Sequence, residues 1–173
     1  MSETASHPFV HLAKQAIEIY IQEKRILSPP DPLPDEMKGA TAVFVSLKKE
    51  GNLRGCIGTI TPTQKNLAQE IITNAIAAAT QDPRFPPVLQ EEFPFLKISV
   101  DVLTPPEIVS NVGELNPKKE GVIVAKGGRR GVLLPDLPGI QDAKRQIQIA
   151  QEKAGIHDLH GATIYKFRVA RYY

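Results

Sequence analysis

The single cysteine of the chain, Cys56, lies in a segment whose residues suit thiol chemistry. Arg54 comes two residues before it, and Gly55 and Gly58 flank it. A nearby guanidinium favours the thiolate, which is the form that attacks electrophiles. The glycines remove side-chain bulk, so a ligand or another backbone segment can approach closely. Cys56 is therefore a candidate nucleophile, and the alternative is a small apolar side chain buried in the core.

Strand periodicity bears on this choice. If residues 53–60 form a regular strand, the period of two places Arg54, Cys56 and Gly58 on one face. A face with an arginine and a glycine is a poor candidate for a dry core. The arginine would then lie beside the thiol and act on it, although a bulge at the glycines would break the alternation.

Two further segments present arginines as candidate anion-binding residues. Asp82 and Arg84 lie in a proline-rich stretch, where they either tie a rigid turn by an ion pair or offer Arg84 to a carboxylate or phosphate. Arg129, Arg130 and Gly131 follow two glycines. These three residues either cradle an anion or form a solvated hairpin tip.

The histidines do not predict a metal site. His7 and His11 have the i, i+4 spacing of helical metal ligands, and His157 and His160 lie three apart. No glutamate lies between the first two and no cysteine lies near the second two, which favours exposed or capping histidines. No spacing places a histidine beside Cys56, so a Cys–His dyad is unsupported. No phosphate-binding loop motif is present either, and we predict no cofactor.

The elements that must position these residues can be read from apolar spacing and turn residues. Residues 61–63 offer an N-cap for the second helix, and residues 48–52 and 126–130 are hairpin loops. The predicted helices are 9–21, 67–79 and 141–154, and the predicted strands are 41–47, 53–60, 97–103, 121–125, 131–134 and 162–169. Hairpin loops between strands favour an α+β fold with a mostly antiparallel sheet flanked by helices. No repeat is apparent in the sequence.

Composition excludes several classes of protein. The chain has 173 residues, of which 42% are hydrophobic and 23% charged, as in ordinary soluble proteins. No apolar run approaches the roughly 20 residues that span a bilayer, and the first residues lack the features of a signal peptide. A net charge of +2 is too small to argue for nucleic acid. We therefore expect a cytoplasmic domain with no membrane span.

Four motifs in one order, with Lys153-Ala154-Gly155 after them, resemble the AMMECR domain family over nearly the whole chain. The motifs are residues 53–59, residues 82–88, the strand 98–102 with Pro105-Pro106-Glu107, and residues 128–135. The resemblance implies one domain over 1–173, with a larger sheet-and-helix part and a smaller lobe. It carries the motif positions onto Arg54, Gly55, Cys56, Gly58, Asp82, Arg84, Arg129, Arg130 and Gly131. It supplies no established reaction.

Prokaryotic members are called AmmeMemoRadiSam system protein A, which implies a Memo-like protein and a radical S-adenosylmethionine enzyme as partners. Relatives often have tryptophans near the third helix and after the Lys-Ala-Gly segment, whereas this chain has none. Two hypotheses follow. In the first, Cys56 and Arg54 meet Arg84 or the Arg129-Arg130 loop in a cleft that binds an anionic small molecule for thiol-based catalysis. In the second, the domain is a non-catalytic protein-binding module.

Overall fold

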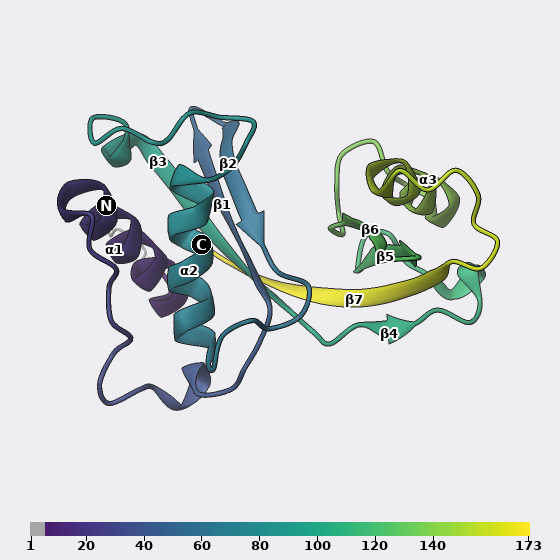
Figure 1. The fold of residues 1–173 in the computed structure, drawn as a ribbon, viewed down its shortest axis with the longest axis horizontal. Helices are drawn as coiled ribbons and strands as arrows, with labels where there is room; N and C mark the ends of the chain where they lie inside the picture. Colours follow the sequence, from purple (N-terminus) through teal and green to yellow (C-terminus); the bar gives the residue numbers. More distant parts are fainter. Residues whose placement is uncertain (1–5) are drawn as a thin grey trace. The chain divides into compact units, whose positions relative to one another are not determined.

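The computed structural model describes residues 6–173, which form an α+β fold with an antiparallel sheet, as predicted (Figure 1). The α-helices and strands are, in chain order, α1 (Pro8–Glu23), β1 (Val43–Lys49), β2 (Asn52–Gly58), α2 (Leu67–Thr80), β3 (Leu96–Leu103), β4 (Glu107–Ile108), β5 (Glu120–Lys126), β6 (Arg129–Leu133), α3 (Ala143–Ala154) and β7 (Thr163–Tyr172). Short 3₁₀ helices are η1 (Asp35–Met37), η2 (Phe93–Phe95) and η3 (Val112–Glu114).

The chain divides into two compact units. Unit 1 runs to Leu103 and also includes Ala170–Tyr173, and unit 2 is Thr104–Val169. The strand order is β2-β1-β3-β7-β5-β6, and β4 pairs with β7. The chain returns from unit 2 to unit 1 along β7.

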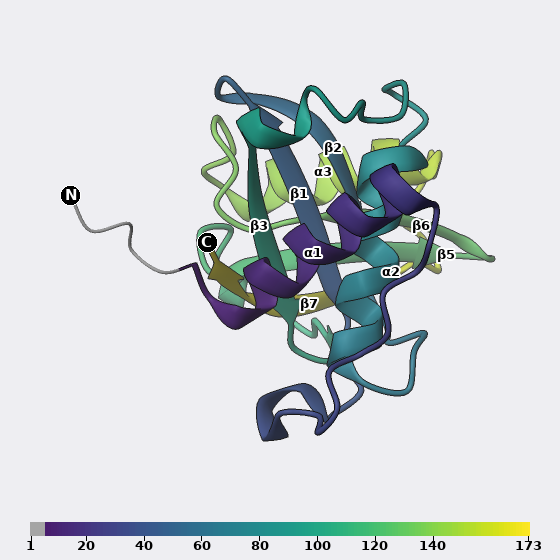
Figure 2. The same ribbon diagram turned by 90° about the vertical axis from the view of Figure 1, so that its left-hand side faces the viewer.

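Unit 1 places α1 and α2 side by side over one face of β1, β2 and β3 (Figure 2). The alternate residues Val43, Val45 and Leu47 of β1 are fully buried on this face, with the apolar side chains of both helices. Ser46 and Phe44 alternate with them on the opposite face, where their partners on β2 are Cys56 and Gly58. Strand periodicity thus sets the thiol apart from the apolar core of unit 1.

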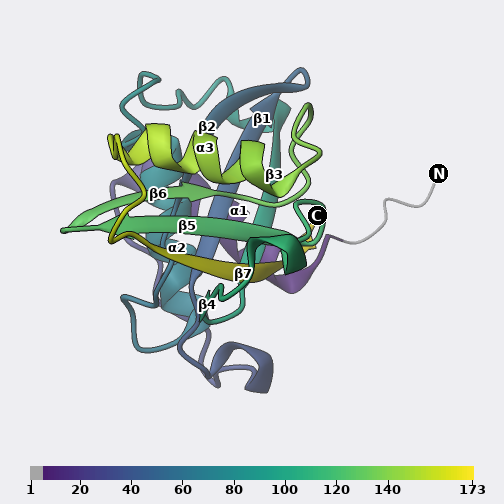
Figure 3. The same ribbon diagram turned by 90° about the vertical axis from the view of Figure 1, so that its right-hand side faces the viewer.

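Unit 2 repeats this plan on a smaller scale. Its hairpin β5–β6 closes through Gly127 and Gly128, both with positive φ, and α3 packs over β5 and β6 (Figure 3). The core between them is formed by apolar side chains such as Val122, Val124 and Ile147. The predicted glycine-rich hairpin loop is confirmed.

Helix starts differ from the prediction because particular side chains cap them. Asn66, rather than residues 61–63, caps α2, with its Oδ1 accepting the Gln69 N–H at 2.9 Å. Helix α3 begins at Ala143 because Asp142 caps it by accepting the Arg145 N–H. At the other end Gly155 takes the left-handed conformation that ends the helix, as predicted.

Two glycines of the predicted site are required by packing. A Cβ on Gly55 of β2 would lie 2.2 Å from the carbonyl oxygen of Ala78 in α2, and one on Gly131 of β6 would lie 1.7 Å from that of Ala150 in α3. Each glycine therefore lets a helix backbone lie directly against a strand.

Candidate functional site

Cys56 lies on β2, at the outer edge of the strand order, directly across from Ser46 of β1. The Ser46 hydroxyl donates a hydrogen bond to the Cys56 sulfur at 3.2 Å. The thiol is half-buried. It is therefore neither part of the apolar core of unit 1 nor a freely exposed group.

The surroundings of the thiol keep it protonated. Burial is the largest effect and raises the pKa of Cys56 above its ordinary value, whereas the Ser46 hydrogen bond and the charge of Arg84 lower it. Asp101 and Asp82 raise the pKa further. At neutral pH the resting side chain is a thiol, which is a weaker nucleophile than a thiolate.

Asp82 joins the two motifs that the sequence singled out. Its buried carboxylate accepts the Cys56 backbone N–H at 3.0 Å and binds the Arg84 guanidinium through two hydrogen bonds of 3.0 and 2.7 Å. The Arg84 hydrogen bonds are the main reason why the pKa of Asp82 lies far below its usual range. The segment after α2 is thereby fixed along the free edge of β2.

Arg84 is an exposed cation held in one place. Its side chain is 55% exposed although two of its nitrogens bind Asp82. The guanidinium carbon lies 5.5 Å from the centre of the Phe85 ring, which supports it from one side. The ion pair that the structural interpretation expected is present, and the binding of an anion by the exposed guanidinium stays a prediction.

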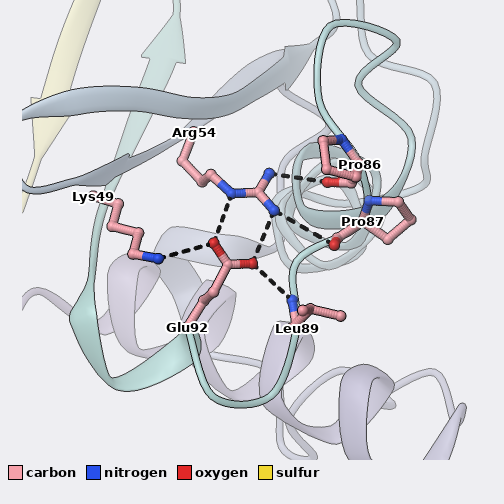
Figure 4. A network of polar contacts seen from close by, with 6 residues as sticks. All are labelled: Lys49, Arg54, Pro86, Pro87, Leu89 and Glu92. Carbon is pink, nitrogen blue, oxygen red and sulfur yellow. Dashed lines mark hydrogen bonds and ion pairs between the residues drawn. The ribbon is translucent and has the colours of Figure 1, made fainter.

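The side chain of Arg54 forms its hydrogen bonds with other residues of unit 1. Its guanidinium forms a bidentate pair with Glu92, at 3.0 and 2.9 Å, and donates to the carbonyls of Pro86 and Pro87 (Figure 4). Lys49 reaches the same carboxylate at 3.2 Å. The Arg54 hydrogen bonds, followed by the one from the Leu89 N–H and by that from Lys49, lower the pKa of Glu92 to about 2. The side chain of Arg54 is only 12% exposed.

The predicted alternation along β2 is interrupted. Leu47 pairs with Gly55 and Lys48 pairs with Leu53, so the register shifts at Arg54. Such an irregularity changes the direction of a side chain. The expectation that Arg54 lies beside the thiol and acts on it is therefore corrected, since the cation that lowers the pKa of Cys56 is Arg84.

Gly58 has a packing role as well. A Cβ at this position would lie 2.2 Å from the ring of Phe44, its partner on β1. The aromatic ring covers the glycine on the same face as Cys56. In this motif, the group that closely approaches Gly55 is therefore a carbonyl of α2, and the group that approaches Gly58 is an aromatic ring.

The third predicted motif lies in unit 2. The Arg129 Nη1 donates to the Gly155 carbonyl at 2.6 Å, so this side chain ties the hairpin to the end of α3. Gly131 lies under α3, as described above. Arg130 is exposed, and we find no hydrogen bond or ion pair for its guanidinium within residues 6–173.

Two acidic residues matter more than the sequence indicated. Glu92 pairs with Arg54 across 38 positions, so no local sequence pattern indicates its role. Glu70 in α2 is fully buried and accepts hydrogen bonds from Thr59, from Thr63 and from the Gln64 N–H. Its carboxylate fixes the connection between β2 and α2. The one local signal of this role is the position of Glu70 in the first turn of α2.

His7 has a structural task. Its Nδ1 accepts the Phe9 N–H at the start of α1, and its ring packs against Tyr172. Within residues 6–173 we find no group of three or more histidine, cysteine or acidic side chains placed to hold a metal ion. None of the helices in the same range has the length and apolar character needed to cross a membrane.

Comparison with known proteins places the chain in a family. A protein of Thermotoga maritima is 50% identical over 169 residues, which is 96% of this chain and 97% of that protein. Protein CA_C1420 of Clostridium acetobutylicum is 46% identical over 95% of this chain, which spans only 36% of that longer protein. The crystal structure of the uncharacterised protein PH0010 from Pyrococcus horikoshii is similar, with a TM-score of 0.86 at 35% identity, and covers 94% of this chain and 88% of its own. The family model AMMECR1 matches residues 10–172, and the chain therefore belongs to the AMMECR1 family of uncharacterised proteins.

Proposed function

We propose that this protein binds a small anionic molecule between Arg84 and Cys56. The observation that carries the proposal is the position of Asp82, whose buried carboxylate holds both an exposed guanidinium and the backbone of the thiol residue. A planar guanidinium suits a carboxylate or phosphate group, and fixing it beforehand lowers the entropy lost on binding.

The thiol would meet the bound anion as a hydrogen-bond donor. Nucleophilic catalysis by Cys56 would need a base to remove its proton, and Asp82 is a poor base because its pKa lies far below the usual range. Binding is therefore favoured over covalent catalysis. Arg54, Gly55 and Gly58 support the site by fixing β2 and the segment after α2, rather than by touching the anion.

A titration with inorganic phosphate and with acetate, followed by nuclear magnetic resonance, tests this proposal. We expect the amide signals of Cys56 and Arg84 to shift, and Arg84→Ala to weaken binding about tenfold, equivalent to about 1.4 kcal/mol. Arg25→Ala is the matched control, because Arg25 is equally exposed at 57% and also pairs with a carboxylate two positions away. Equal binding by both variants would overturn the proposal.

A second candidate function is a cytoplasmic protein-binding module, and the unpartnered Arg130 favours it. The family resemblance makes a Memo-like protein and a radical S-adenosylmethionine enzyme the partners to test. Co-purification with either protein that is lost on Arg130→Ala and kept on Arg145→Ala would support this function. No complex at micromolar concentrations would count against it.

A further inference from the structure

The two units share one arrangement of strands and helix. In unit 1 the order of elements is β1, β2, α2, β3 and the strands lie in the order β2-β1-β3, while in unit 2 it is β5, β6, α3, β7 with the strands β6-β5-β7. The hairpin turns match as well. Glu50 and Gly51 have φ values of 51° and 80°, and Gly127 and Gly128 have 54° and 81°.

The registers of the hairpins identify equivalent residues. Gly55 pairs with Leu47, which lies two positions before Lys49 at the first hairpin turn. Gly131 pairs with Val124, which lies two positions before Lys126 at the second. Both glycines meet an alanine carbonyl of the helix that follows. The residue after each glycine is therefore equivalent, so Val132 in unit 2 corresponds to Cys56 in unit 1.

In unit 1 the free edge of β2 is occupied by the chain itself. The Cys56 N–H points away from β1 and donates to the Asp82 carboxylate. The long segment 81–95 between α2 and β3 supplies this carboxylate together with the carbonyls that bind Arg54. In unit 1 this kind of edge therefore accepts a segment with acidic side chains, which contacts the strand through a carboxylate and not as a further strand.

In unit 2 the corresponding connection, residues 155–162, is shorter, and it forms hydrogen bonds with the hairpin only near the hairpin turn. The carbonyls of Gly155 and Asp158 accept Arg129 and Lys126. A two-residue turn makes Lys126 and Arg129 the closing hydrogen-bonded pair, so the backbone groups of Val132 face outward by alternation. The Val132 carbonyl accepts the Lys153 ammonium at 2.8 Å, and among residues 6–173 we find no acceptor for its N–H.

We infer that the outer edge of β6 binds an extended acidic segment of a partner protein. A carboxylate of that segment accepts the Val132 N–H, as Asp82 does for Cys56, and a second one pairs with the exposed Arg130. Sheet edges commonly bind peptide segments, and here the contact is made by side-chain carboxylates, because the Val132 carbonyl already accepts the Lys153 ammonium. Arg129, Arg130 and Lys153 give this edge a positive charge that is complementary to acidic side chains. The inference does not depend on the anion site at Arg84. It identifies the surface through which the protein-binding module, the second candidate function, would bind its partner.

A titration of the full-length protein with the peptide acetyl-(Asp-Val)₄-amide tests this inference, with acetyl-(Lys-Val)₄-amide as the charge-reversed control. We expect only the acidic peptide to shift the Val132 amide signal and to slow its hydrogen exchange about tenfold. Arg130→Ala should weaken binding about tenfold, whereas Arg145→Ala, which removes an exposed arginine on α3, should change it less than about twofold.

Val132→Pro removes the outward N–H but no hydrogen bond to β5, so it should also abolish binding. Arg130→Ala complements it, because that change leaves the backbone of β6 intact. The inference is overturned if the acidic peptide binds both arginine variants equally or leaves the Val132 amide unchanged. It is also overturned if the edge is used for self-association that excludes the peptide. Peptide binding that fails while a partner complex survives would reject this surface and leave the module function standing.

Discussion

Arg54 and Arg84, the two arginines of the predicted site in unit 1, have different roles. Arg54 donates hydrogen bonds to Glu92 and to two carbonyls, and so fixes the loop that carries them. Arg84 binds Asp82 through two nitrogens, and its side chain stays 55% exposed. Exposure and a fixed position together are what an anion-binding group needs. At the residue scale, the proposed anion site therefore rests on the charge of Arg84 and not on that of Arg54.

We predict that Glu92→Gln destabilises the protein by about 2–3 kcal/mol. The change keeps the shape of the side chain but leaves the Arg54 guanidinium, which is only 12% exposed, without its counter-charge. Urea unfolding measures the effect. Glu23→Gln, at an exposed pair with Arg25, is the control and should cost less than about 1 kcal/mol. Equal losses in both variants would contradict this role for Glu92.

The three α-helices and all strands except the short β4 followed from local sequence patterns, but the partners of the site did not. Apolar spacing indicated all three helices, and turn residues indicated both hairpins. The shift at Arg54 arises from pairing with β1, which no single segment reveals. Glu92 and Asp82 meet β2 only after the chain has turned around the end of α2. The repeated arrangement of the two units is likewise a matter of pairing and left no apparent sequence repeat.

At the scale of elements, the contact of each helix with its hairpin depends on one glycine. We predict that Gly55→Ala and Gly131→Ala each destabilise the protein by at least about 2 kcal/mol, because the new methyl group would collide with a helix carbonyl that cannot move alone. Thermal unfolding followed by circular dichroism provides the measurement. Gly39→Ala meets nothing within 4 Å and should be nearly neutral. A tolerated Gly131→Ala would show that α3 does not lie this close to β6.

For the whole molecule, the lowered pKa of Glu92 predicts loss of stability in acid. A carboxyl group with a pKa of about 2 in the folded state, against an ordinary 4.5, stabilises the fold above pH 4.5. That contribution is lost as the pH falls from about 4.5 to about 2, because the unfolded chain then binds the proton more readily. Asp82 acts in the same direction.

The midpoint of unfolding, measured from pH 7 to pH 2, tests this dependence. The unmodified protein should lose stability steeply below about pH 4.5, and Glu92→Gln should show a flatter profile because glutamine does not titrate in this range. Glu23→Gln should follow the unmodified protein. A Glu92→Gln profile as steep as that of the unmodified protein would show that this carboxylate contributes nothing to acid stability.

The rate at which iodoacetamide alkylates Cys56 in the folded protein, with and without inorganic phosphate, tests the anion site most directly. A phosphate bound at Arg84 neutralises the charge that lowers the pKa of the thiol, and it also blocks access of iodoacetamide to the sulfur. We therefore predict that alkylation is about fivefold slower at saturating phosphate. This protection should vanish in Arg84→Ala and persist in Arg25→Ala. An alkylation rate that phosphate does not change, or that it slows equally in Arg84→Ala, would contradict the proposal.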